Sequence, residues 1–167
     1  MNLSSITITL PSKALENAKK RAESEGKPLE EFIAEVFLKQ LDIKDPEAKV
    51  ELHLKLCEKY LKEAEDFLAK KDYVRASEKA WGAASQIVKA LAAKEGKELV
   101  SHASLWEYMD ELAEKLGDVE LRHLWGRANN LHQNFYEEWM PPREVELSVR
   151  DVKAFVEKLR ANVVRSR

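Results

Sequence analysis

The first apolar residues of the chain alternate strictly with polar ones. Over the stretch SITITLP, Ile6, Ile8 and Leu10 fall on one face, which is the two-residue period of a half-buried strand. Pro11 ends this strand because it has no N–H to donate. A single strand of this length is not stable without a neighbour. We therefore expect it to pair with the same strand of a second chain, which predicts a homodimer.

The period then changes from two residues to that of a helix. After a predicted N-cap at Ser12, the stretch KALENAKKRAESE carries its apolar residues at helical spacing, and Gly26 suits the end of that helix. Pro28 then begins a second helix, which extends to about Leu41. The Asp45-Pro46 pair breaks the pattern. The sequence therefore predicts an N-terminal segment at residues 1–44 and a second unit at residues 45–167.

The second unit carries helical periodicity throughout. Ser148 and Asp151 form a predicted capping box at the start of its last helix. The connections are short, so neighbouring helices should pack antiparallel. The predicted helices span about residues 46–70, 72–94, 101–116 and 119–139, followed by the C-terminal helix. The overall prediction is a mainly α protein with one short N-terminal strand.

The helix at 72–94 is rich in alanine and apolar on almost every side, so we expect it at the centre of the bundle. Its thinner polar side includes Gln86 and Lys89, and this side is either solvated or faces an anion. His53, on the preceding helix, has no partner at metal-ligand spacing and is interpreted as structural. His102 follows the predicted cap Ser101 and is interpreted as a packing residue.

Composition narrows the classes of function. The net charge is −2, which excludes a basic surface over the whole chain, so any nucleic-acid surface must be local. Charged residues make up 35% of the chain, which is compatible with a thermophile. The single cysteine, Cys57, argues against a secreted disulfide scaffold. Neither a signal peptide nor a membrane-spanning run is present, so we expect a cytoplasmic protein.

The order strand, helix, glycine turn, helix over residues 5–41 resembles the ribbon-helix-helix fold. That resemblance implies a DNA-binding role for the outward strand residues Ser5, Thr7 and Thr9. Residues 1–44 contain seven Lys or Arg and seven Asp or Glu, so they lack the net positive charge that favours phosphate binding. The alternative is a segment that only dimerises.

The stretch RANNLHQNFYEEW gathers the candidate chemistry of the second unit. Arg127 and His132 are five residues apart, which separates them by about 140° and about 7.5 Å on a helix. One helix therefore cannot easily aim both at one atom, but two chains meeting about a dyad could. Asn129 and Asn130 can hold polar groups in place, and Tyr136 follows His132 by one turn.

Three stretches, ASEKAWGAASQIVKALAAKEG, SHASLWEYM and RANNLHQNFYEEW, together resemble the archaeal PaREP family, whose helical domain belongs with the HEPN domains. That resemblance implies a dimeric helical bundle and a place in a toxin–antitoxin or defence system, with a partner protein. Many HEPN domains are metal-independent ribonucleases, and their signature falls here on Arg127 and His132.

In such an enzyme His132 would move protons, Arg127 would neutralise charge on the phosphorane, and Asn130 would complete the polar site. The main hypothesis is nevertheless a nucleic-acid or nucleotide binding module. The alternatives are a metal-independent ribonuclease and a DNA-binding regulator. No motif for a metal or a cofactor is present, so we expect neither.

Overall fold

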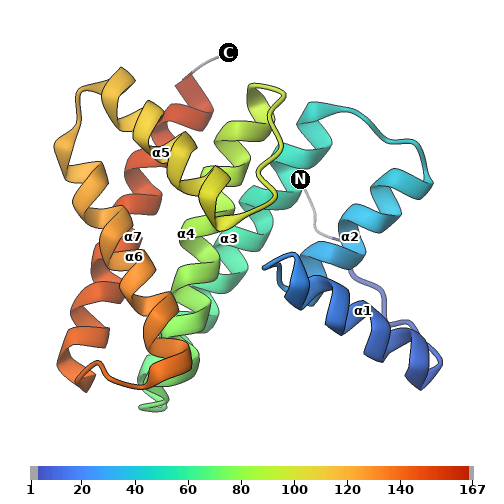
Figure 1. Ribbon diagram of the computed structural model, residues 1–167, viewed down its shortest axis with the longest axis horizontal. Coiled ribbons are helices and arrows are strands. Elements are labelled where there is room, and N and C mark those ends of the chain that lie inside the picture. Colours follow the sequence, from blue (N-terminus) through green and yellow to red (C-terminus); the bar gives the residue numbers. More distant parts are fainter. Residues whose placement is uncertain (1–3, 166–167) are drawn as a thin grey trace.

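The computed structural model describes residues 4–165, and there the chain forms seven α-helices and no strand (Figure 1). The mainly α prediction is confirmed. The helices are α1 (Ser12–Ser24), α2 (Leu29–Gln40), α3 (Pro46–Ala69), α4 (Tyr73–Lys94), α5 (His102–Leu116), α6 (Val119–Glu137) and α7 (Pro142–Arg165).

The predicted N-terminal strand is wrong. Residues 4–11 belong to no regular element, and the side chains meant for a buried face are exposed, to 84% at Ile6, 43% at Ile8 and 40% at Leu10. Apolar and polar residues do alternate over this segment, but a strand forms only where a second strand accepts its hydrogen bonds. The described part of the chain offers none.

Helix α4 lies at the centre of a bundle made by α3 to α7 (Figure 1). It packs along α3 and also contacts α5, α6 and α7. Small residues permit this, and Gly82 shows it best, because a Cβ atom there would lie 3.1 Å from Cδ2 of Tyr60 on α3. The central position expected for this alanine-rich helix is confirmed.

Helices α1 and α2 form a separate pair on one side of the bundle (Figure 1). Phe32 and Ala22 are buried, and Glu31 points inward to α4. The outer side of α2 and the Leu41 residue that follows the helix are apolar but exposed, to 53% at Phe37 and 63% at Leu41. The pair therefore has one covered face and one uncovered apolar face.

Two helices begin where the sequence predicts, after Asp72 and after Ser101. Asp72 accepts from the backbone N–H of Arg75, and Ser101 accepts from that of Ser104. The predicted caps at Ser12 and Ser148 are wrong. Ser12 already lies within α1, after a Pro11 N-cap that makes no side-chain bond.

Helix α7 begins at Pro142 rather than at the predicted capping box of Ser148 and Asp151. A proline at the start of a helix has a suitable φ and loses no hydrogen bond there. Ser148 is consequently buried within the helix, near the sulfur of Met140. None of the seven helices carries an apolar run long enough to cross a lipid bilayer.

Candidate ligand-binding site

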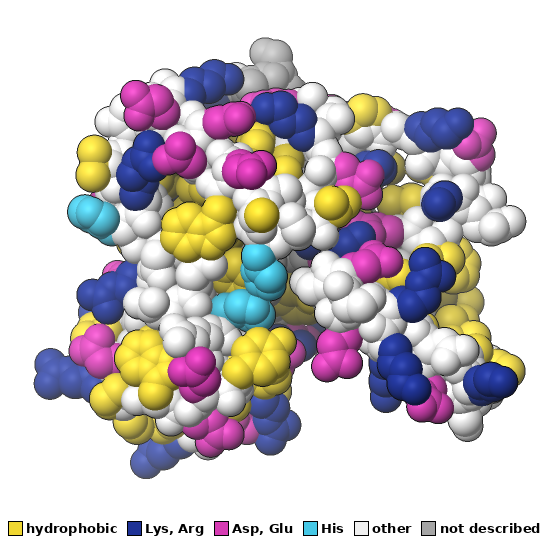
Figure 2. Space-filling model, viewed as in Figure 1, with side chains coloured by type: hydrophobic (Ala, Val, Ile, Leu, Met, Phe, Trp, Pro, Cys, Tyr) yellow, Lys and Arg dark blue, Asp and Glu magenta, His cyan; other side chains and the backbone are white. Residues whose placement is uncertain are grey.

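A cleft of about 600 Å³ lies between the α1–α2 turn and the bundle helices α4 and α6. Figure 2 shows two histidines beside this hollow, at the boundary between the bundle and the N-terminal helices. The start of α5 closes one end of it. Four segments that are distant in sequence therefore meet around one space.

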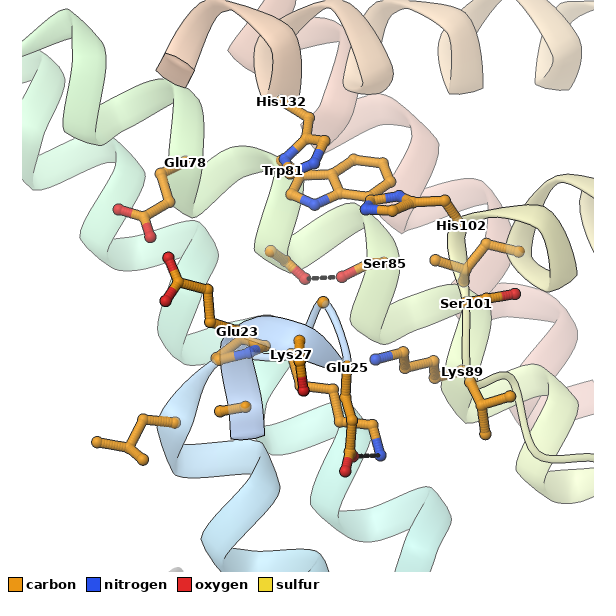
Figure 3. A pocket seen from close by; sticks show the side chains of 18 of the residues that line it. Glu23, Glu25, Lys27, Glu78, Trp81, Ser85, Lys89, Ser101, His102 and His132 are labelled. Carbon is orange, nitrogen blue, oxygen red and sulfur yellow. Dashed lines mark hydrogen bonds and ion pairs between the residues drawn. The ribbon is translucent and has the colours of Figure 1, made fainter. Parts of the chain in front are cut away.

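Four rings form the bundle wall of the cleft. Trp81 of α4 stacks on His132 of α6, with 4.7 Å between ring centroids, and on His102 of α5, with 5.6 Å. The two histidine rings are 4.8 Å apart. Tyr136 meets His132 edge-on at 5.3 Å, as its spacing of one helical turn predicts, and is 68% exposed. In Figure 3 the two histidines approach Trp81 from α5 and α6.

His132 is held in its neutral form. Burial lowers the pKa of His132 to about 4, and the neighbouring His102 contributes to the decrease. The Nδ1 atom of His132 is buried and has no hydrogen-bond partner among the described residues. A protonated ring would leave a buried N–H unpaired there, which is costly. At neutral pH the side chain therefore acts as an uncharged aromatic ring.

The opposite wall depends on a glycine. Gly26, in the turn between α1 and α2, has a φ of +64°, a left-handed conformation that side chains rarely adopt. A Cβ atom at this position would also lie 3.6 Å from Nε2 of His102. The turn can therefore approach the histidine pair closely.

The rim of the cleft carries charges without ion-pair partners among the described residues. Glu23 of α1 and Glu78 of α4 are exposed, and their carboxylates point toward one another (Figure 3). Lys19 is exposed at the same rim. Lys27, in contrast, is occupied by Glu25 and Glu35. The cleft thus offers two free acceptors and one free cation around an aromatic wall.

A buried polar network lies behind the cleft. The Lys89 ammonium donates to Glu31, and the Gln86 amide donates to the other oxygen of that carboxylate, each at 2.7 Å. His53 Nδ1 lies 2.7 Å from Gln86 Oε1. Burial alone would raise the pKa of Glu31, but Lys89, together with His53 and Gln86, more than offsets it, so the pKa is lowered. The polar side of α4 therefore faces an anion, but that anion is the protein's own Glu31.

His53 is structural in this network, but it also stands near a second carboxylate. One oxygen each of Glu31 and Glu35 and one ring nitrogen of His53 lie within 4.8 Å of one another. In the described part of the chain this is the one group of three such side chains that could hold a metal ion.

The structure does not bring Arg127 to His132 within one chain. Arg127 is 49% exposed and points to α7, where its guanidinium lies 3.5 Å from Glu144 and 3.7 Å from Asp151. Asn130 is exposed and does not line the cleft. His132 is therefore the only one of these three predicted residues at the described cleft.

The predicted DNA-contacting residues lie elsewhere. Ser5, Thr7 and Thr9 are exposed on the segment before α1, which forms no strand. Their side chains point into no cleft described above. Their role stays a prediction.

Sequence reasoning missed two members of the ring cluster. Trp81 was one of several apolar residues on a helix expected to be buried on all sides, and His102 was interpreted as local packing. Their meeting with His132 depends on tertiary packing, which no spacing along the chain reveals.

The chain is similar to known proteins over its helical bundle. The model of the archaeal PaREP1/PaREP8 family matches residues 52–156, well over half of the chain. The chain is also similar to a protein from Sulfolobus solfataricus whose crystal structure is known, at 28% sequence identity and a TM-score of 0.57. That match covers 66% of this chain and 97% of the other. A search of the curated proteins gives no match. The family match begins after α1 and α2, so it covers the ring wall of the cleft but not the turn opposite.

Proposed function

The chain belongs to the archaeal PaREP1/PaREP8 family, and from its cleft we propose that it binds a nucleobase-bearing ligand, either a nucleotide or a single-stranded RNA. The observation that carries this proposal is the cluster of Trp81, His102, His132 and Tyr136 on one wall of a 600 Å³ cleft. A space of this size accepts a small molecule of nucleotide size.

Stacking is the first support. Every base has a π-face, and stacking on an aromatic side chain contributes about 1–3 kcal/mol per base. Tyr136 is 68% exposed at the rim, and His132 is uncharged, so neither ring needs to lose a charge to accept a base. The rings therefore favour a flat ligand over an aliphatic one.

The charges at the rim are the second support. Glu23 and Glu78 can accept hydrogen bonds from the amino and imino groups of a base, because ionised carboxylates are acceptors only. Lys19 can meet a phosphate at the same rim. A single free cation suits a ligand with one phosphate group in the cleft better than a polyphosphate.

Titration of the purified protein with nucleoside monophosphates and with short single-stranded RNA tests this proposal. Ligand stacking near Trp81 should quench tryptophan fluorescence in a saturable manner. Tyr136→Ala should weaken binding about tenfold or more, since it removes a stacking surface. His132→Ala should weaken it as well.

His123→Ala is the matched control, because His123 is exposed on the same helix and does not line the cleft. It should bind as the unmodified protein does. Equal loss in His123→Ala and His132→Ala would contradict the proposed site, as would the absence of saturable quenching by any of these ligands.

A metal-independent ribonuclease is the second candidate, and the observation in its favour is the second histidine, His102, beside His132. Two imidazoles at one cleft could serve as acid and base. The pKa of about 4 for His132 is far from the operating pH that suits proton transfer, so binding is placed first. Cleavage of RNA in EDTA that is lost in both His132→Ala and Arg127→Ala would favour the enzyme.

Arg127 could enter such a site only from a second chain, so the ribonuclease depends on a dimer. We propose a homodimer formed through the exposed apolar side of α2, where Phe37 and Leu41 lie uncovered. Light scattering should give twice the mass of 19.2 kDa, and Phe37→Asp should give the monomer mass. A monomer mass for the unmodified protein would contradict it.

The similarity to HEPN domains and a toxin–antitoxin or defence role with a partner protein also stay proposals, supported by the helical bundle and the family. DNA binding through Ser5, Thr7 and Thr9 rests on their exposure alone. A gel-shift assay with the upstream region of the gene tests it, and equal binding by the Thr7→Ala, Thr9→Ala double variant would contradict a role for these residues.

A further inference from the structure

Helices α2, α3 and α4 meet at a buried group of side chains that is separate from the ring wall of the cleft. Glu31 and Glu35 are one turn apart on α2, so they share a face. His53 reaches them from α3, and one ligand atom of each of the three lies within 4.8 Å of the others. We propose that Glu31, Glu35 and His53 bind a divalent transition-metal ion such as Zn²⁺.

The hydrogen bonds fix which nitrogen of His53 can bind a metal. Gln86 donates its Nε2–H to Glu31, so its Oε1 atom, 2.7 Å from His53 Nδ1, must be an acceptor. His53 therefore carries its proton on Nδ1 and, when neutral, a lone pair on Nε2. Metal-binding histidines commonly donate their other N–H in this way.

Both carboxylates retain free lone pairs. Each oxygen of Glu31 accepts one hydrogen bond, from Lys89 or Gln86, and a carboxylate oxygen can accept two. Glu35 is held by Lys27 at 2.5 Å. Lys27 also lies 3.3 Å from Glu25, so it keeps a partner when a metal ion takes Glu35. The ammonium of Lys27 is thus the group that a metal would replace.

The local charge and the donor set decide the kind of ion. Glu25, Glu31 and Glu35 face Lys27 and Lys89, which leaves one net negative charge. One imidazole with two carboxylates suits zinc, iron or manganese better than calcium, which prefers oxygen ligands only.

Around zinc, ligand atoms are about 3.4 Å apart, so ligand atoms that lie within 4.8 Å of one another need to approach by at most about 1.4 Å. Such an ion would join α2 to α3 and hold the N-terminal helices against the bundle. An ion pair between Lys59 of α3 and Glu30 of α2 already links the two helices beside this group.

Isothermal titration of the metal-free protein with Zn²⁺ tests the proposal, with Mg²⁺ as the comparison ion. We expect one high-affinity zinc ion per chain and no comparable heat from Mg²⁺. Glu35→Gln should weaken zinc binding by about tenfold or more, as loss of a ligand or of its support does. Glu30→Gln is the control, because Glu30 lies on the same helix but pairs with Lys59 at the surface. Equal affinity in both variants, or no zinc binding at all, would overturn the proposal.

Lys27→Met gives a test of opposite sign. Because it removes the competing ammonium, zinc affinity should rise, whereas a merely structural ion pair predicts no such gain. Ring-nitrogen NMR of the unmodified protein needs no variant to fold. Zinc should shift the His53 signals at one equivalent and leave those of the exposed His123 in place. An unchanged affinity in Lys27→Met, or a response at His123 instead of His53, would overturn the site.

Discussion

Replacing Lys89 with methionine tests what holds the N-terminal helices to the bundle. The Lys89 ammonium lies 2.7 Å from Glu31, and the side chains are 8% and 0% exposed, respectively. Methionine keeps an unbranched side chain of similar length but provides no charge. Glu31 would then be a buried carboxylate supported only by the Gln86 amide and by the more distant Lys27.

The expected cost follows from this burial. Removing one partner of a buried ion pair destabilises a protein by about 3–5 kcal/mol, because the remaining charge is left uncompensated. The molecule has one way to limit this cost. If α1 and α2 detach from the bundle, Glu31 is hydrated again and its charge costs nothing. The decrease in stability therefore cannot exceed the free energy with which these two helices dock on the bundle.

Urea unfolding followed by circular dichroism measures the free energy of unfolding, and limited proteolysis at the linker around residues 41–45 reports detachment. Lys59→Met is the matched control, because its ion pair with Glu30 joins α3 to α2 with side chains 44% and 48% exposed. An exposed pair of this kind contributes at most about 1 kcal/mol. Lys89→Met should therefore either lose several times more stability than Lys59→Met or become sensitive to protease at the linker. Equal stability and equal protease resistance in the two variants would refute the reasoning.

Three further predictions follow from buried contacts. Gly82→Ala should destabilise the bundle in urea unfolding, because the new Cβ would lie 3.1 Å from Cδ2 of the buried Tyr60 ring and this crowding outweighs the gain of about 1 kcal/mol in helix propensity; no loss would show that the Tyr60 ring can shift to accept the methyl group. Asn134→Ala should cost about 1–3 kcal/mol by the same assay, since it leaves the buried N–H of Met140 without its acceptor, and a neutral result would contradict this role. The contribution of His132 to the free energy of unfolding should be full above pH 6.5 and should fall as the pH decreases toward about 4, because in that range the imidazole is protonated in the unfolded chain but not in the folded one. His132→Phe should remove this part of the pH dependence from unfolding curves recorded at pH 4 to 7. An unchanged pH dependence would contradict the prediction.

The sequence predicted the helices well because they depend on local chemistry. Asp72 and Ser101 begin helices as expected, and the alanine-rich stretch that includes Gly82 lies at the centre of the bundle. The start of α7 was misplaced because Ser148 and Asp151 satisfy a capping pattern that also occurs inside a helix. A pattern of two residues cannot show that Pro142 has already begun the helix.

The strand and the site were harder for a different reason. Ile6 and Ile8 alternate correctly, but a strand is a property of two segments, and the periodicity of one cannot supply the other. His132 was chosen from one stretch of the sequence, whereas its neighbours in the cleft, Trp81 and His102, come from other helices. Arg127 was paired with His132 through the resemblance to HEPN domains and only across two chains, and within one chain its side chain contacts α7.

The central claim is that the cleft between the α1–α2 turn and the ring cluster binds a nucleobase-bearing ligand. Ring-nitrogen NMR of the four histidines during titration with a nucleoside monophosphate tests it most directly, because the chain provides its own control. Saturable shifts are expected at His102 and His132 and none at His123, which lies outside the cleft. Signals of His102 and His132 that stay in place up to millimolar ligand, or that move no more than that of His123, would contradict it.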